Sequence, residues 1–237
     1  MVALMKLELR KHHINTYLIA ALVLTMVMLA FIYLFAYVPQ FDPNDADLHL
    51  FVGYQNIISL FGVIHMTVFC ILASVMYTRF VIDEYTGKRV IRLFSYPVKR
   101  GKVFFSKVLV ISLFTMITML ISSILIFSIF GLSETISPIV DERMTVAFIT
   151  KAIKTTIVLA IAAASLSIIA MGIGFIQRSV PTTIISAILL SSIFCNIVAG
   201  TLSTSDTPII LAMILAILGG VFVVGMLAKK INQMEAG

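Results

Sequence analysis

The sequence predicts an all-α membrane protein with six transmembrane helices. Of its 237 residues, 60 % are hydrophobic and 12 % are charged, and the mean hydropathy is +1.11. An ordinary soluble domain carries roughly 25 % charged residues. Six mainly apolar runs are each long enough to cross a hydrocarbon core about 30 Å thick as helices. Because lipid offers the backbone no hydrogen-bond partners, each run must satisfy its own backbone as a helix.

Proline residues and polar clusters separate the six runs. The predicted spans are residues 17–38, 57–78, 108–130, 155–176, 181–200 and 208–228, with ends expected to be good to about four residues. The first run is longer than the apolar core of a usual signal peptide, and no small-x-small cleavage pattern follows it. We therefore interpret it as a retained helix, and we treat residues 1–237 as one transmembrane domain.

The distribution of lysine and arginine predicts the orientation. With both termini in the cytoplasm, fourteen of the 17 Lys and Arg lie on the cytoplasmic side, eight of them between Arg79 and Lys107. Short cytoplasmic loops of membrane proteins are enriched in these residues. The net charge of +6 therefore predicts contact with the anionic inner surface of the membrane and not with nucleic acid.

Residues 1–14 can form a short amphipathic helix in the inner interface. Val2, Met5 and Leu9 lie on one stripe, with Lys6 and Arg10 beside it. The pattern is imperfect, so a plain cytoplasmic extension into the first span is an equally open alternative.

Several classes of function lack the residues they need. No Asp, Glu, Lys or Arg lies inside the predicted spans, whereas ion-coupled carriers place ionisable groups there. The zincin, serine-hydrolase and G-x-x-x-x-G-K-[ST] patterns are missing. Cys70 and Cys195 have no metal-ligand spacing and are expected to pack as small apolar residues. The chain is therefore not predicted to be an enzyme, and any ATP must be bound by another chain.

Two polar residues inside the spans are candidates for a substrate path. His65 lies in the second span and Asn196 near the outer end of the fifth. A histidine there either packs against a hydroxyl or a backbone carbonyl, or lines a path and titrates near neutral pH. Asn196 is equally ambiguous.

Small residues recur at three- and four-residue steps in two of the spans. They are Ala160, Ala163, Ser167, Ala170 and Gly174 in the fourth span, and Ala212, Ala216 and Gly219 in the sixth. Such stripes let helices approach closely, so they predict packing seams within the subunit or across a dimer. The short connection at 177–180 predicts a tight hairpin with Gln177 and Arg178 at its apex.

A basic stretch at residues 83–102, DEYTGKRVIRLFSYPVKRGK, separates the second and third spans. The second helix can continue to Gly87, a favourable stop. Residues 88–94 then form a short amphipathic helix with Val90, Ile91 and Phe94 on one face. This helix ends before Pro97, because the residue preceding a proline avoids helical geometry. These residues alone leave two alternatives open, a docking element or a surface anchor.

The stretch resembles the cytoplasmic loop of ABC-2-type permeases, the membrane subunits of ATP-binding-cassette exporters. The matching residues are Glu84, Thr86-Gly87, Ile91, Leu93, Pro97-Val98-Lys99-Arg100 and Lys107. The chain departs from the family in reading Thr-Gly where Gly-Thr is frequent. Many relatives also carry a re-entrant hairpin between the fifth and sixth spans, for which residues 201–207 are too few. Either the fifth helix breaks near 196–200, or the gate is built differently. The larger outer loops, 39–56 and 131–154, are candidates for that role.

The resemblance implies a single transmembrane permease domain, 1–237, in the bacterial cytoplasmic membrane. It implies two cytosolic ATPase subunits that bind ATP and Mg, a second permease copy or paralogue, and no cofactor bound by this chain itself. Residues 88–94 would be the coupling helix. The implied ATPase-contact residues are Glu84, Gly87, Arg89, Val90, Ile91, Leu93, Phe94 and Pro97.

Small bacterial permeases of this make-up resemble groups that export or confer immunity to antimicrobial peptides such as bacitracin and lantibiotics. The resemblance implies an exporter of a hydrophobic or amphipathic substrate. The alternative from another class is a non-transporting membrane scaffold or a peptide-sensing subunit that signals to a partner.

Overall fold

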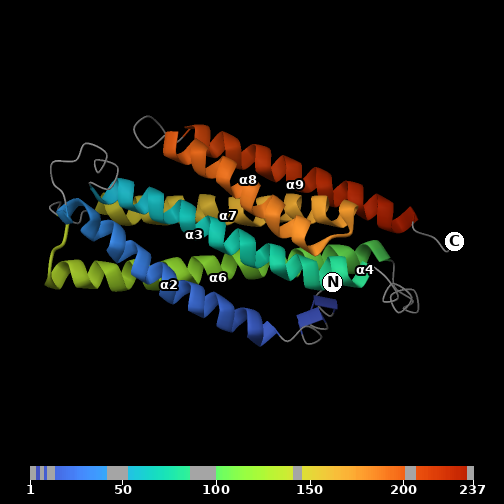
Figure 1. The fold of residues 1–237 in the computed structure, drawn as a ribbon, viewed down its shortest axis with the longest axis horizontal. Helices are drawn as coiled ribbons and strands as arrows, with labels where there is room; N and C mark the ends of the chain where they lie inside the picture. The colour runs from blue at the N-terminus through green and yellow to red at the C-terminus, as the bar shows by residue number, and fades with distance from the viewer. Residues whose placement is uncertain are drawn as a thin grey trace.

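The computed structural model describes residues 4–5, 8–9, 14–41, 53–85, 100–140, 146–200 and 207–233. Within these ranges all regular secondary structure is helical, and six helices are long and apolar enough to cross a membrane, which confirms the predicted fold class. The elements are α2 (Ile14–Phe41), α3 (Tyr54–Tyr77), the π-helix η2 (Thr78–Ile82), α4 (Asp83–Tyr85), α6 (Arg100–Ile136), α7 (Val146–Gln177), α8 (Val180–Gly200) and α9 (Thr207–Gln233). Figure 1 shows them as one elongated bundle.

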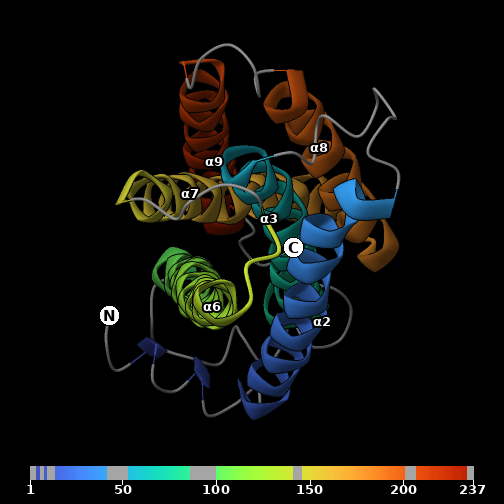
Figure 2. The same cartoon turned by 90° about the vertical axis from the view of Figure 1, so that its left-hand side faces the viewer.

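Helices α3 and α7 form the centre of the bundle. Helix α3 packs against α2, α6, α7 and α8, and α7 packs against α6, α8 and α9. Figures 1 and 2 show α2 and α6 on one side of this pair and α8 and α9 on the other. Most side chains in the apolar stretches of α3 and α7 are buried, whereas those of α2, α8 and α9 mostly face outward. These outward faces carry exposed Leu, Ile, Val and Phe, as lipid contact requires.

The bundle has two ends, which we name by a lysine at each. At the Lys107 end, on the right of Figure 1, α4 and α9 end and α6 begins. At the Lys151 end α2 ends and α7 and α9 begin. The lysine and arginine pattern predicts that the Lys107 end faces the cytoplasm. That orientation stays a prediction.

Several helices are longer than predicted. Helix α6 runs from Arg100 to Ile136, where the sequence predicted 108–130, and α7 begins at Val146, where residue 155 was predicted. These differences exceed the expected error, because hydropathy marks only the part of a helix that suits hydrocarbon and a helix continues into the interface. As a result Lys107 and Glu134 both lie within α6, although the predicted spans hold no charged residue.

The second helix continues beyond its predicted span, as expected. After Tyr77 the chain forms η2 and then α4, so that one rod extends from Tyr54 to Tyr85. The predicted stop at Gly87 and the coupling helix at 88–94 lie outside the described residues. Of the predicted N-terminal helix, positions 4–5 and 8–9 are helical and the rest of residues 1–13 is likewise outside.

The predicted hairpin and packing seams are confirmed. Only Arg178 and Ser179 separate α7 from α8, and Arg178 adopts a left-handed φ of 50°. The Ser179 amide donates to the Gly174 carbonyl at 3.1 Å. In the fourth-span stripe, Ala160, Ala163, Ser167, Ala170 and Gly174 are all buried. In the sixth-span stripe a Cβ on Gly219 would contact Ile169 of α7, so this seam lies within the subunit.

Helix α8 is unbroken from Val180 to Gly200. Of the two alternatives that the sequence left open, a break of the fifth helix near 196–200 is therefore wrong. Residues 196–200 continue the helix because no proline interrupts them and a single terminal glycine is tolerated there.

Gly174 lets the end of α7 approach the start of α8. A Cβ at this position would overlap Thr183 Oγ1 and lie 2.8 Å from Thr183 Cβ. We predict that Gly174→Ala lowers the free energy of unfolding by roughly 1–3 kcal/mol, the usual cost of overpacking. Thermal unfolding of the purified protein in detergent checks this. Gly225→Ala is the matched control, because nothing lies within 4 Å of its Cβ. Equal melting temperatures for the two variants would contradict the prediction.

Candidate functional site

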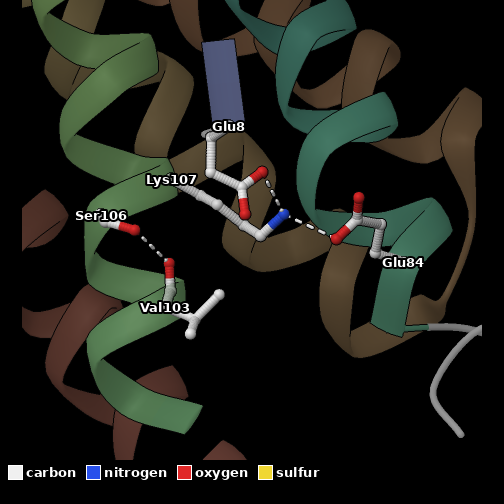
Figure 3. Close-up of polar contacts among 5 residues, drawn as sticks. All are labelled: Glu8, Glu84, Val103, Ser106 and Lys107. Carbon is white, nitrogen blue, oxygen red and sulfur yellow. Dashed lines mark hydrogen bonds and ion pairs between the residues drawn. The ribbon is translucent and has the colours of Figure 1, made fainter. Parts of the chain in front are cut away.

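A fully buried lysine joins three segments at the Lys107 end. The side chain of Lys107, on α6, is 0 % exposed. Its Nζ lies 2.6 Å from Oε2 of Glu84 on α4 and 2.9 Å from Oε2 of Glu8 in the N-terminal segment. Figure 3 shows both carboxylates pointing at the ammonium from opposite sides. We call Glu8, Glu84 and Lys107 the ion cluster.

The π-helix positions Glu84 in this cluster. A π-helical turn takes up more residues than an α-helical turn, so it rotates all later side chains about the helix axis. After η2, Asp83 lies near the surface, where its carboxylate is 3.4 Å from the exposed Arg79 guanidinium. Glu84 and Tyr85 are buried. The same helix end therefore presents one acid to the surface and the next to Lys107.

The surroundings of the ion cluster are apolar. Residues of η2, α4, α6 and α7 pack together beside it, including Phe80, Tyr85, Phe104, Met171 and Phe175. Charges in so apolar a place are tolerated only when they are paired and hydrogen-bonded. The neighbouring Ser106 hydroxyl donates to the Val103 carbonyl at 2.8 Å (Figure 3) and needs no partner from another helix. The ion cluster thus fixes Glu8, α4 and α6 relative to one another.

The predicted ATPase-contact residues divide between the described and undescribed parts of the chain. Glu84 lies in the ion cluster. Gly87, Arg89, Val90, Ile91, Leu93, Phe94 and Pro97 lie outside the described residues, so their role stays a prediction. Lys107 belonged to the family pattern but was not predicted as a site residue. Its position just before the run VLVISLF is the signal that could have found it.

Sequence reasoning missed Glu8 altogether. It lies beside the apolar stripe of residues 1–14, where an acid looks like an ordinary solvated residue. A partner 99 positions away in the chain leaves no local pattern.

His65 lies in a polar network between helices. Its Nε2 is 3.0 Å from the Ser122 hydroxyl and its Nδ1 is 3.3 Å from the Ser123 hydroxyl, both on α6. The Thr25 hydroxyl of α2 lies 2.8 Å from that of Ser122. The ring stacks on Phe61 and is 1 % exposed. This arrangement corresponds to the packing alternative, and a substrate path at His65 stays a prediction.

Asn196 lies on the surface of α8. Its amide donates to the Ser192 carbonyl of the same helix at 2.9 Å. It lines a hollow of about 190 Å³ between α3 and α8, together with Ser59, Leu60, Val63, Ile64, Cys195 and Val198. His65 does not line this hollow, so the two predicted path residues do not meet in one pocket.

A second buried carboxylate lies at the Lys151 end of α6. Glu134 is 5 % exposed and accepts a hydrogen bond from the Tyr54 hydroxyl at 2.9 Å. It also accepts bonds from the backbone amides of Ile139 and Val140. Glu134 therefore ties the start of α3 to the segment that follows α6. The sequence placed this acid in an outer loop, because the predicted span ended at residue 130.

Six membrane-length helices, with an ion cluster where α4 and α6 flank residues 86–99, define a multi-pass membrane protein. The chain belongs to the ABC-2 transporter family, since the family model described as ABC-2 family transporter protein matches residues 4–192. It is thus a permease-type component of an ABC transporter in the bacterial plasma membrane, and the ATPase of such a transporter is a separate subunit.

A curated relative is similar over much of the chain. Uncharacterized protein YcbO of Bacillus subtilis (strain 168) is 27 % identical over 166 residues, which are 70 % of this chain and 71 % of the relative. No solved structure matches the chain.

The ion cluster predicts a strong dependence of stability on Lys107. Lys107→Met leaves the buried carboxylate of Glu84 and the partly buried carboxylate of Glu8 without their shared cation, so we expect a loss of about 3–5 kcal/mol in the free energy of unfolding. Replacing all three members, with Glu8→Leu and Glu84→Leu added, should recover part of that loss. Thermal unfolding in detergent is the measurement, and Lys102→Met on the exposed face of α6 is the control. A Lys107→Met protein as stable as the control would show that the cluster contributes little.

The His65 network allows a direct test of the substrate-path prediction. A glutamine amide can bond both serine hydroxyls, so we expect His65→Gln to preserve transport and its pH profile. Transport assays between pH 5 and pH 8, the range in which histidine titrates, provide the measurement. A shifted profile in a protein of normal stability would instead assign His65 to the path.

Proposed function

We propose that this chain is the membrane-spanning subunit of an ATP-driven exporter of hydrophobic or amphipathic substrates, with an antimicrobial or other peptide as cargo. It pairs with a second permease copy or a paralogue and with two cytosolic ATPase subunits that bind ATP and Mg. This chain binds no nucleotide. Its membership of the ABC-2 family supports the ATP-driven part of the proposal.

The ion cluster is the observation that carries the coupling mechanism. In the sequence, residues 86–99 connect the end of α4 at Tyr85 to the start of α6 at Arg100. Glu84 and Lys107 lie on these two flanking helices and contact each other at 2.6 Å. Because this contact keeps the end of α4 and the start of α6 together, a force applied to residues 88–94 moves α3 and α6 as a pair.

The N-terminal segment shares this coupling through Glu8. Its carboxylate bonds the same ammonium, so movement of Lys107 also moves the segment that precedes α2. ATP-driven closure of the two ATPases would press on residues 88–94. The ion cluster would pass that displacement to α2, α3 and α6. The transmembrane substrate cavity of the assembled transporter would then switch between inward and outward access.

The polar character of the interior supports an apolar or amphipathic cargo. Between the two ends of the bundle, the buried polar groups of the described helices are mainly Ser and Thr. Many of these hydroxyls donate to a carbonyl three or four residues earlier in their own helix, as those of Ser74, Thr115 and Ser165 do. An interior of this kind offers apolar surface with a few hydroxyls.

The experiment that tests the function is co-expression with an ABC ATPase, which is first sought among the neighbouring reading frames. The complex is purified, reconstituted in vesicles and assayed for ATP hydrolysis with and without candidate peptides. Peptide-stimulated hydrolysis together with peptide movement supports an exporter. Peptide binding without movement or ATP dependence would favour the scaffold or sensor alternative.

The coupling proposal predicts a split between assembly and membrane insertion. Ile91→Asp places a charge on the apolar face of the proposed coupling helix, which is expected to contact the ATPase, and Leu93→Asp places one beside that face. We expect each to abolish co-purification of the ATPase while the permease still inserts in the membrane. Affinity purification and membrane fractionation measure the two effects. Lys99→Gln and Arg100→Gln are the controls and should do less, because basic residues that flank a membrane helix are expected to meet lipid headgroups. Retained complex and transport with both Asp substitutions would refute the coupling role.

A further inference from the structure

Tyr85, the last residue of α4, carries a buried hydroxyl without a hydrogen-bond partner. The residue is 8 % exposed. Among the described residues, its hydroxyl is the only buried side-chain nitrogen or oxygen that makes no hydrogen bond. A buried donor left unpaired is costly, and buried polar groups are normally bonded. Phenylalanine would fill the same space without that cost, so the present arrangement of the helices does not explain the hydroxyl.

Two aromatic neighbours hold the ring of Tyr85 in place. Its centroid lies 6.3 Å from that of Phe104 on α6 and 5.7 Å from that of Phe175 on α7, both in edge-to-face geometry. These contacts involve the ring and leave the hydroxyl unpaired. A ring packed against two helices cannot swing toward a distant acceptor, so a partner has to approach the hydroxyl.

Two carboxylates lie near enough for their charges to act on this hydroxyl. They belong to Glu84 and Glu8, the two acids of the ion cluster. Glu84 precedes Tyr85 on the same helix, and adjacent side chains of a helix point about 100° apart and do not face each other. Glu8 comes from a separate part of the chain, which can move relative to α4. Glu8 is therefore the acceptor that can reach Tyr85.

From this geometry we infer that Tyr85 is a second docking point for the Glu8 carboxylate. In the structure described above, Oε2 of Glu8 lies 2.9 Å from Nζ of Lys107, which ties Glu8 to α6 (Figure 3). In the second position the Tyr85 hydroxyl donates to Glu8 and ties it to α4 instead. Lys107 keeps Glu84 as its counter-ion, now at 2.6 Å. No buried charge is left without a partner in either position.

Tyr85 lies where a displacement of the proposed coupling helix first reaches the described helices. It ends α4 and directly precedes residues 86–99 in the sequence. A push on residues 88–94 that shifts α4 against α6 changes the distance of Glu8 from its two donors. The use of this exchange in the transport cycle rests on the proposed function, whereas the exchange itself rests on the contacts of the ion cluster and Tyr85.

A double-mutant cycle tests the exchange without an ATPase or a transport substrate. The full chain is purified in detergent and its thermal unfolding is measured. In the otherwise unchanged protein, Tyr85→Phe removes only the unpaired hydroxyl, so we expect the melting temperature to rise by a few degrees. In Lys107→Met, Glu8 has lost the ammonium and the Tyr85 hydroxyl becomes its donor. There, Tyr85→Phe should lower the melting temperature by a few degrees.

Tyr77→Phe is the matched control. The buried Tyr77 hydroxyl donates to the Val108 carbonyl at 3.3 Å and lies 2.9 Å from the Ser112 hydroxyl, so its removal should lower the melting temperature in both backgrounds. Glu8→Leu added to Lys107→Met removes the proposed acceptor, and Tyr85→Phe should then raise the melting temperature again. If Lys107→Met does not fold, Lys107→Gln takes its place, because its shorter, neutral side chain also releases Glu8 from the ammonium.

Three results would overturn the inference. A lower melting temperature on Tyr85→Phe in the otherwise unchanged protein shows that the hydroxyl already has a partner there, such as a bound water. A rise in both backgrounds shows that no acceptor reaches the hydroxyl. A fall in Lys107→Met that persists after Glu8→Leu is added shows that the acceptor is a group other than Glu8.

The use of the exchange in transport has a separate measurement. In the reconstituted transporter, Tyr85→Phe should leave co-purification of the ATPase unchanged and lower peptide-stimulated ATP hydrolysis severalfold. Full stimulated hydrolysis by this variant would show that the exchange has no part in the cycle. If the unchanged transporter shows no stimulated hydrolysis, the proposed function fails, and the thermal measurements still decide whether the exchange exists.

Discussion

The pairing of Lys107 constrains everything around it. An ammonium with no exposed surface is tolerable in an apolar setting only when carboxylates hold it. Glu84 therefore has to point inward, which requires the rotation supplied by the π-helix at Thr78–Ile82. Glu8 has to come from the other side, which requires residues 8–9 to lie beside α6. One buried charge thus determines how three separate segments meet, and two of them border residues 86–99, which contain the proposed coupling helix.

The rest of the bundle is held by shape. Apolar side chains of α2, α8 and α9 face lipid on one side and the bundle on the other, so the hydrophobic effect does little to favour one helix arrangement over another in a membrane. The positions at which two helix backbones can approach closely determine the arrangement instead. A Cβ on Gly62 would lie 2.7 Å from Leu159, and one on Gly220 would lie 3.5 Å from the Ser165 carbonyl. Glycine at these points lets α3 and α9 pack closely against α7. The close packing of α3 and α7 at the centre of the bundle is a consequence.

The sequence predicted the parts of this structure that depend on composition. Six helices, the hairpin at 177–180, the small-residue seams and the family all follow from apolar length, spacing and a local motif. Helix ends were predicted less well, because hydropathy measures lipid compatibility and α6 continues past it at both ends, carrying Lys107 and Glu134. The pairing of Glu8 with Lys107 could not be predicted at all, because two residues 99 positions apart leave no periodic signal and only the folded chain brings them together.

The buried carboxylates of Glu84 and Glu134 lie at opposite ends of the bundle, and each joins two segments. Glu84 pairs with a lysine and thereby locks α4 to α6, whereas Glu134 accepts from a tyrosine hydroxyl and two backbone amides and locks α3 to the segment after α6. Both contacts join the second and third membrane helices, one at each end. These helices also share the His65 network with Ser122 and Ser123 between the two ends. Polar contacts at three depths therefore join α3 and α6 into one unit. If these two helices slid past one another, buried polar groups would be left unpaired, which is costly. A displacement applied at the Lys107 end is therefore passed along both helices to the far end.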